Sequence, residues 1–168
     1  FMTTVHAYTS DQQVQDMAVA SRSGKKDIRR MRAANLSIIP NSTGAAKAIG
    51  QVLPKLDGKL SGMSLRVPTP VGSITDLTGQ VKKDVSVEEV NAAFEKAAND
   101  KSYRSVLEYS NEELVSADIV GNPSSCIYSA VDTMTQGKTV KILGWYDNEW
   151  GYSNRVLDLA LFLEEQGI

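Results

Sequence analysis

The chain has 168 residues, of which 42% are hydrophobic and 23% charged, and its formal net charge is -2. This length fits one domain with a core of its own, and the composition excludes the low hydrophobicity and high net charge of a disordered protein. A near-neutral charge gives no general attraction to nucleic acid or to an anionic membrane, so any anion-binding site has to be local.

Location and metal content are also constrained by composition. No apolar run approaches the roughly 20 residues of a membrane span, and the beginning FMTTVHAY lacks the basic region of a signal peptide, so we expect a cytoplasmic protein. The single cysteine, Cys126, excludes an intrachain disulfide and fits a reducing compartment. One histidine and one cysteine are too few for a typical zinc site, and we predict no metal.

The first part of the sequence predicts a strand, a long loop and a helix. Residues 2–8 are rich in β-branched and aromatic residues, which is typical of a strand. Residues 10–35 scatter Ser, Asp and Gly among charges, which indicates a long surface loop with a helical turn. Within residues 38–60 a helix is expected to begin just after Pro40, capped by a Ser or Thr hydroxyl.

Strands and one further helix are expected next. Apolar and polar residues alternate over 63–70 and 71–83, as in half-buried strands. Residues 86–100 form the clearest helix, because Ser86 and Glu89 make a capping box. Four more strands are expected, over residues 105–110, 114–120, 124–130 and 139–148.

The chain closes on a strong helical pattern over residues 154–167, with Leu157, Ala160 and Leu161 on its inner face. Strands that cluster in the middle with few helices between them favour an α+β fold, a mixed, mostly antiparallel sheet with helices packed on one face. No repeat or linker divides the chain, so residues 1–168 are expected to form a single domain.

Two short motifs could bind anions. In NSTGAAK, Thr43 and Gly44 stand at an expected helix start, where free N–H groups and the helix dipole favour a phosphate, although a hydroxyl that only caps its own helix is the simpler interpretation. KKDIRRMR supplies Arg29, Arg30 and Arg32, whose guanidinium groups suit phosphate, or else form a solvated basic loop.

A third candidate is Arg66, which lies in an apolar strand pattern. A buried guanidinium needs a carboxylate or an anionic ligand, and the two alternatives are equally compatible with the sequence. His6, the only histidine, is followed by Thr9 and Asp11, which together offer a proton acceptor beside an anion-binding hydroxyl; a packing histidine is the alternative. Pairing His6 with Cys126 as nucleophile is disfavoured, because Cys126 lies in an apolar strand pattern as a small buried residue.

Aromatic residues surround Asn148 in GWYDNEWGYSNR, residues 144–155, at the expected exit of a strand and start of a helix. An amide flanked by aromatic rings could grip a planar ligand that carries an amide, whereas an aromatic core edge or an oligomer interface would use the same residues.

Five segments together resemble the phosphorylating glyceraldehyde-3-phosphate dehydrogenases, in order along the whole chain. They are TTVHAYTSDQ, DIRRMRAA, IIPNSTGAAKAIGQVLPKLDGKL, GMSLRVPTPVGSITDL and WYDNEWGYSNRVLDL. The resemblance is confined to the C-terminal catalytic domain of that family. Neither a glycine-rich dinucleotide fingerprint nor an SCTTN-type segment with the nucleophilic cysteine is found. We therefore expect a fragment, without the N-terminal NAD-binding domain, that is inactive in isolation.

The resemblance implies a role for each candidate residue. His6 would activate the cysteine and act as acid or base; Thr9, Asp11 and Arg66 would bind the phosphate of the substrate, with Arg30 between the two anion sites. Thr43 and Gly44 would bind the attacking inorganic phosphate, and Asn148, with Tyr152 nearby, would orient the nicotinamide of NAD. The substrates implied are glyceraldehyde 3-phosphate and inorganic phosphate, and the full-length protein would be a tetramer.

Two other functions remain open at this point. The same domain could serve as a non-catalytic adhesion or assembly module, because a solitary domain of this family would expose apolar surface. Alternatively, the chain could derive from a relative of erythrose-4-phosphate dehydrogenase.

Overall fold

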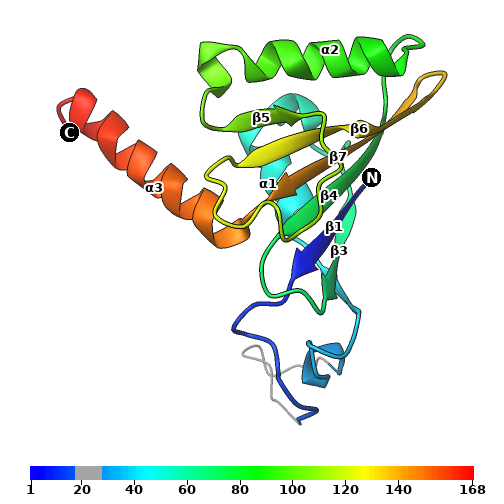
Figure 1. Ribbon diagram of the computed structural model, residues 1–168, viewed down its shortest axis with the longest axis vertical. Coiled ribbons are helices and arrows are strands. Elements are labelled where there is room, and N and C mark those ends of the chain that lie inside the picture. Colours follow the sequence, from blue (N-terminus) through cyan, green and yellow to red (C-terminus); the bar gives the residue numbers. More distant parts are fainter. Residues whose placement is uncertain (18–27) are drawn as a thin grey trace. The chain divides into compact units, whose positions relative to one another are not determined.

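The structure is a computed structural model that describes residues 1–17 and 28–168, without the side chains of residues 46 and 47. Its strands are β1 (Met2–Ala7), β2 (Ile39–Ser42), β3 (Gly62–Val67), β4 (Ser73–Gln80), β5 (Leu107–Ser110), β6 (Cys126–Gln136) and β7 (Thr139–Tyr146) (Figure 1). Its helices are α1 (Ala45–Val52), α2 (Val87–Ala98) and α3 (Asn148–Glu165), with short 3₁₀ helices η1 (Arg29–Met31), η2 (Pro54–Leu56) and η3 (Lys101–Tyr103).

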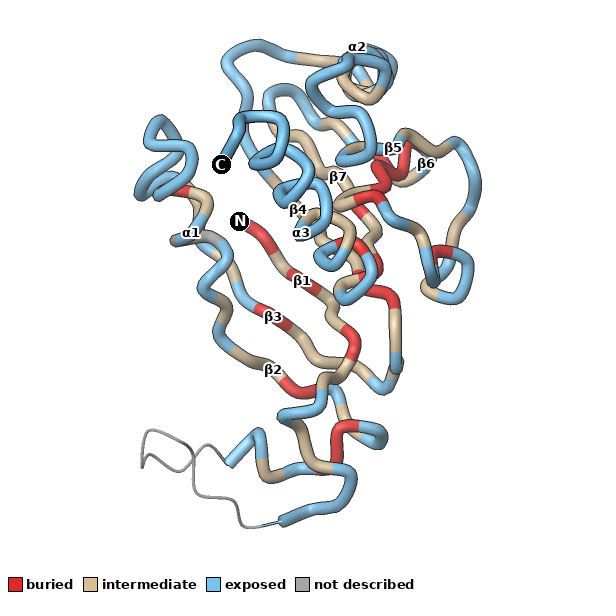
Figure 2. The backbone as a smooth tube through the Cα atoms, turned by 90° about the vertical axis from the view of Figure 1, so that its left-hand side faces the viewer, coloured by how far each residue is buried: buried red, intermediate tan, exposed pale blue. Residues whose placement is uncertain are grey.

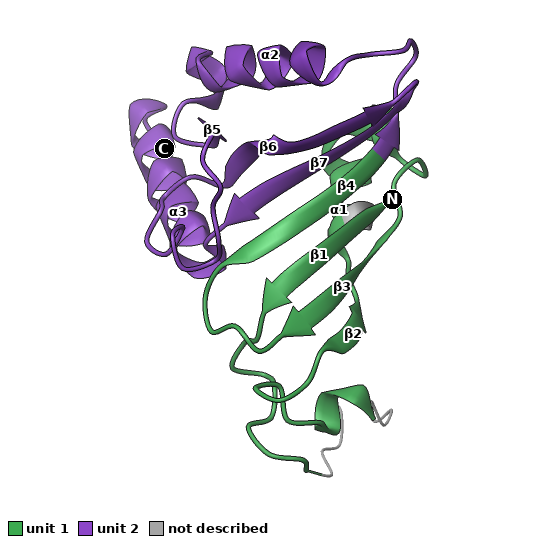
Figure 3. Cartoon of the chain, turned by 45° about the vertical axis from the view of Figure 1, so that its right-hand side comes forward, with its two compact units in different colours: residues 1–78 green, residues 79–168 purple. Residues whose placement is uncertain are grey.

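The chain divides into two compact units, Phe1–Thr78 and Gly79–Ile168 (Figure 3). In the first unit the strand order is β2-β3-β1-β4. β1 runs parallel to β3 and antiparallel to β4, and β2 runs antiparallel to β3. The parallel register aligns His6 with Arg66, which lies 60 positions later in the sequence. This alignment positions the candidate site.

In the second unit, β6 lies between β7, to which it is antiparallel, and β5, to which it is parallel. Helix α2 packs against β5 and β6, and the ring of Phe94 stacks on Tyr128 with 4.0 Å between ring centroids. The Tyr128 hydroxyl is buried and donates to Asn91 Oδ1 at 2.7 Å, so its polar end is satisfied inside the core. The expected α+β class with a mixed, mostly antiparallel sheet is confirmed.

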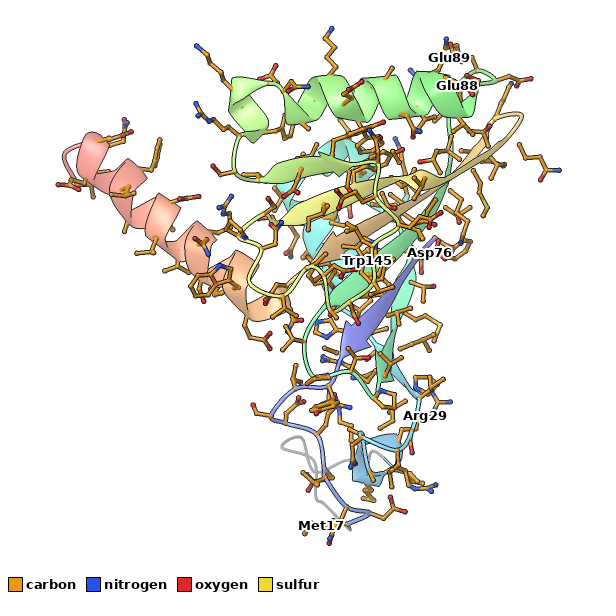
Figure 4. The ribbon with its side chains drawn as sticks, in the orientation of Figure 1. Met17, Arg29, Asp76, Glu88, Glu89 and Trp145 are labelled. Carbon is orange, nitrogen blue, oxygen red and sulfur yellow. The ribbon has the colours of Figure 1, made fainter. Side chains whose placement is uncertain are left out.

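The helix with the strongest sequence signal is confirmed together with its cap. Ser86 Oγ accepts from the N–H of Glu89 at 3.2 Å, and Glu89 Oε2 accepts from the N–H of Ser86 at 2.9 Å. Glu88 and Glu89 lie at the first turn of α2 (Figure 4), where the positive end of the helix dipole stabilises their negative charges.

Two local predictions were wrong. The helix expected just after Pro40 begins only at Ala45, because residues 39–42 pair antiparallel with β3 as strand β2, and its N-cap is Gly44 instead of a Ser or Thr. Residues 114–120 form no strand, and residues 116–120 are turns. Asp118 Oδ2 accepts from the N–H of Val115 at 2.7 Å, which closes a local loop in place of ladder bonds.

The expected inner face of the last helix is not buried in this chain. Leu157 and Leu161 are 64% and 58% exposed, Ala160 is exposed as well, and Figure 2 shows α3 exposed along nearly all its length. The helix itself starts earlier than expected, at Asn148.

The expected long loop before β2 includes a helical turn, η1, in its described part, and its residues 18–27 lie outside the described residues. Among the helices that the structure describes, none combines the length and the apolar character that crossing a membrane requires.

The close approach of β1 and β3 makes Gly62 a sensitive position. A Cβ at Gly62 would lie 2.4 Å from the carbonyl oxygen of Met2, whereas a Cβ at Gly79 on β4 would meet nothing within 4 Å. We expect Gly62→Ala to lower the free energy of unfolding by about 1–3 kcal/mol through overpacking against backbone, and the matched Gly79→Ala to leave it unchanged or slightly higher. Urea unfolding measures both; equal stability of the two variants would contradict this account of the β1–β3 contact.

Candidate functional site

The centre of the site is a contact between His6 on β1 and Arg66 on β3. Residues aligned on neighbouring strands have side chains on the same face of the sheet, so the two side chains are neighbours. Arg66 Nη1 lies 3.0 Å from His6 Nδ1, 3.0 Å from the carbonyl oxygen of Ala7 and 3.3 Å from Thr9 Oγ1. His6 and Arg66 are both half-buried.

The geometry assigns the proton of neutral His6 to Nδ1. His6 Nδ1 lies 2.7 Å from the carbonyl oxygen of Ala7, which also accepts from Arg66. A guanidinium can only donate, whereas a carbonyl oxygen has two lone pairs and accepts both N–H groups. With the proton on Nδ1, Nε2 is the ring nitrogen that carries the lone pair of the neutral imidazole.

The peptide that follows His6 is held from its other side by Ser73. The N–H of Ala7 donates to Ser73 Oγ at 3.1 Å, and Ser73 is 1% exposed. Sequence analysis did not identify Ser73; the only signal was a hydroxyl residue in the predicted strand 71–83. The main-chain position beside the imidazole is therefore fixed by strand β4 as well as by Arg66.

Thr9, Asp11 and Arg30 extend the cluster. Thr9 Oγ1 donates to Asp11 Oδ1, and Arg30 Nη1 donates to Asp11 Oδ2 at 2.9 Å. The hydrogen bond from Thr9 lowers the pKa of Asp11 from 3.8, and the charges of Arg30 and Arg66 add to the decrease, against partial burial. A carboxylate thus holds a hydroxyl and a guanidinium in place next to Arg66.

The three arginines of KKDIRRMR have different partners in the structure. Arg30 reaches Asp11, Arg32 Nε donates to Asp16 Oδ2 at 3.0 Å, and Arg29 Nη1 is 3.4 Å from the carbonyl oxygen of Pro40. Arg29 is the first residue of η1 (Figure 4). Of the three, Arg30 is the one in contact with the cluster around His6.

Thr43 and Gly44 lie apart from this cluster. On β2, Ile39 is the residue opposite Arg66. Thr43 comes four positions after Ile39 in the sequence. At the rise of a strand this separation is about 13 Å along β2. Thr43 Oγ1 accepts from the N–H of Ala45 at 3.1 Å, and Gly44 is exposed at the start of α1. In this structure the Thr43 hydroxyl serves its own helix.

Asn148 and Tyr152 belong to the second unit, where they form part of the first turn of α3. Asn148 is half-buried and Tyr152 is 71% exposed. The side-chain amide of Asn148 carries a donor and an acceptor, the set that matches a carboxamide.

Cys126 lacks the properties of a nucleophile. Burial raises the pKa of its thiol to about 11, so it is protonated at neutral pH. Its Sγ packs against Gly144, where an added Cβ would lie only 2.7 Å from the sulfur. The residues that the structure describes hold no group of three or more His, Cys, Asp or Glu side chains suited to a metal ion.

In this α+β domain one imidazole lies beside a guanidinium and a hydroxyl, and Thr43 and Gly44 stand apart from them at the start of α1. Residues 1–148 match the family described as glyceraldehyde 3-phosphate dehydrogenase, C-terminal domain, and the chain belongs to this family. It is 54% identical over 166 residues to "Glyceraldehyde-3-phosphate dehydrogenase" of Streptomyces coelicolor. That alignment covers 98% of this chain and 48% of the relative. It is also 54% identical over 159 residues to the protein of that name from Mycobacterium avium, in an alignment that covers 95% of this chain and 45% of the relative. The chain spans about half the length of the curated relatives it matches.

The Asp11 carboxyl group provides a test of the cluster. Because its pKa in the folded chain is below 3.8, its ionisation favours the folded state above about pH 4, and this contribution is lost as the pH falls through the lowered pKa. We expect the side-chain ¹³C resonance of Asp11 to titrate below 3.8, and Thr9→Val and Arg30→Gln each to raise the midpoint.

Arg32→Gln is the matched control, since Arg32 pairs with Asp16 instead of Asp11. A midpoint for Asp11 that responds to Arg32→Gln as strongly as to Arg30→Gln would show that the ion pair with Arg30 is not formed in solution.

Proposed function

We propose that the chain is the single catalytic domain, residues 1–168, of an NAD-dependent phosphorylating glyceraldehyde-3-phosphate dehydrogenase. In this role it acts on glyceraldehyde 3-phosphate and inorganic phosphate, in the cytoplasm. The observation that carries the proposal is the position of Arg66 Nη1, 3.0 Å from His6 and 3.3 Å from Thr9 Oγ1. This contact puts a proton acceptor beside a cationic group and a hydroxyl that suit a phosphate.

His6 is the proposed acid and base. With Nδ1–H donating to Ala7, His6 Nε2 can take the proton of a cysteine thiol supplied by the N-terminal half, and can later return a proton to the reacting oxygen. Arg66 keeps the imidazole in this orientation, because its guanidinium and Nδ1–H share the same carbonyl oxygen.

Thr9, Asp11, Arg30 and Arg66 are the proposed site for the phosphate of the substrate. Arg66 and Arg30 supply donors and positive charge, and Thr9 supplies a hydroxyl. Asp11 orients Thr9 and Arg30 through its two oxygens before the phosphate arrives. Its negative charge also keeps the net charge of the empty site low, so the phosphate enters by competing with Asp11 for donors that are already positioned.

Thr43 and Gly44 are the proposed site for the attacking inorganic phosphate. Both belong to the start of α1, where main-chain N–H groups lack partners within the helix. The distance of about 13 Å along β2 from the residue opposite Arg66 suits two separate anions, one on the substrate and one that attacks.

NAD, bound mainly by an N-terminal domain, would accept the two electrons and the hydrogen removed from the aldehyde. On this chain Asn148 is proposed to hold the carboxamide of NAD, with Tyr152 beside it. The exposed leucines of α3, Leu157 and Leu161, support a longer parent protein, because burial against another domain would remove their apolar surface from water. Assembly of the full-length protein into a tetramer is part of the same proposal.

The isolated chain is proposed to be inactive, because it lacks a reactive thiolate: burial raises the pKa of its only cysteine, Cys126, to about 11. Reduction of NAD by a pure sample of the 168-residue chain with the aldehyde and phosphate would contradict this. A role as an assembly module is favoured instead if the chain self-associates tightly and the full-length parent has no activity. If the parent turns over erythrose 4-phosphate in preference to glyceraldehyde 3-phosphate, the chain derives from a relative of erythrose-4-phosphate dehydrogenase.

The proposed roles predict distinct kinetic effects in the full-length parent. We expect His6→Gln to lower kcat by about 10²- to 10⁴-fold, the usual contribution of a general acid or base. Arg66→Gln is expected to raise KM for the aldehyde phosphate and to lower kcat as well, because it removes a phosphate donor and the group that orients His6.

Arg29→Gln is the matched control, because the hydrogen bond that Arg29 makes to a described residue goes to the carbonyl oxygen of Pro40 and not to the His6 cluster. Steady-state kinetics of the three variants measure kcat and KM for the aldehyde phosphate. Full activity of His6→Gln, or equal losses for Arg29→Gln and Arg66→Gln, would refute the assigned site.

A further inference from the structure

Asp147 is a buried carboxylate at the junction between β7 and α3, and it is only 5% exposed. Its Oδ1 accepts from the N–H of Trp150 at 2.9 Å, so it caps α3. Its Oδ2 accepts from the N–H of Gly121 at 2.9 Å, in the loop before β6. Each oxygen therefore holds a different segment, and a simple helix cap needs only the first of these bonds.

The loop that Asp147 grips is itself fixed to strand β5. Glu108 Oε2 accepts from Asn122 Nδ2 at 2.9 Å and from Ser124 Oγ at 3.2 Å. Asn122 Oδ1 accepts in turn from the N–H of Ser124 at 2.8 Å. Hydrogen bonds at Asn122 and Ser124 thus link the loop to β5, and the bond at the adjacent Gly121 links the same loop to the first turn of α3.

Helix α3 also touches this loop directly. Gly151 is buried, and a Cβ there would lie 3.1 Å from the carbonyl oxygen of Ser124. Beyond this turn nearly every residue of α3 is exposed, and Leu157 is 64% exposed. Further along α3, Arg155 Nη1 donates to the carbonyl oxygen of Ser105. The contacts with the loop are those made by the first turn of α3, which carries Asn148.

We propose that Asp147 is a positioning residue for the cofactor contact made by Asn148, because its second oxygen fixes the orientation of that turn through Gly121. The inference rests on the proposed function and deepens it. Asn148 follows directly after Asp147, so a rotation of the first turn of α3 would move the amide of Asn148 away from a bound carboxamide. Glu108 supports the same arrangement from β5.

The test compares Asp147→Asn with Glu149→Gln. Asparagine caps a helix as well as aspartate does, but its NH₂ group would face the N–H of Gly121, so the loop bond is lost while the cap is kept. Glu149 is exposed in the same turn, and Glu149→Gln removes the same charge without touching the loop. Asp147→Ser, which keeps a capping oxygen but lacks the second oxygen that reaches Gly121, replaces Asp147→Asn if that variant fails to fold.

In the 168-residue chain, amide hydrogen exchange of Gly121 is expected to accelerate in Asp147→Asn and to stay unchanged in Glu149→Gln. In the full-length parent, Asp147→Asn is expected to raise the dissociation constant of NAD about tenfold, as for one lost hydrogen bond to a charged group. KM for the aldehyde is expected to stay unchanged.

A double-mutant cycle with Asn148→Ala separates positioning from a general structural effect. We expect the double variant to bind NAD as weakly as Asn148→Ala alone. If Asp147→Asn leaves NAD binding unchanged, or weakens it equally in the Asn148→Ala background, the inference is wrong while the proposed function stands. If Asn148→Ala itself binds NAD normally, the cofactor role proposed for Asn148 is wrong, and the inference falls with it.

Discussion

Arg66 is the residue on which the candidate site depends, because a guanidinium placed inside a sheet must be met by acceptors on the neighbouring strand. Its Nη1 finds them in the carbonyl of Ala7 and the hydroxyl of Thr9. The same placement brings positive charge within 3.0 Å of the imidazole of His6. An imidazole, a hydroxyl and a cation are thereby held together by the main-chain register of β1 and β3.

The sequence predicted the members of this cluster but could not predict their contact. His6 and Arg66 meet through a parallel pairing across 60 residues, and strand register over such a distance leaves no local signal. Helix α2 was predictable because its capping box is local. β2 was missed because its pairing with β3 overrides the local helix pattern after Pro40. Ser73 was missed because nothing in a strand pattern marks which hydroxyl will receive a distant N–H.

Helix α3 illustrates a different limit. Its apolar residues predict burial, yet Leu157 and Leu161 are more than half exposed. A helical pattern indicates that one face will be covered, and it does not say by which polypeptide. The chain spans about half the length of its curated relatives, and a second domain is the cover that the proposed function supplies. The first turn of α3 differs, because Asp147 and Gly151 bind it to the loop before β6.

The central claim is that the carbonyl of Ala7, to which Arg66 also donates, holds His6 with its proton on Nδ1. Long-range ¹H–¹⁵N correlation spectra of the imidazole distinguish the two tautomers, and the chain has one histidine, so its signals need no further assignment. In neutral His6 we expect Nδ1 to carry the proton and Nε2 to show the shift of an unprotonated nitrogen, and Arg66→Gln to keep this preference, because it removes the cation that competes for the Ala7 carbonyl. A predominant Nε2–H form in the unsubstituted chain would contradict the account, because Nδ1 would then accept from Arg66.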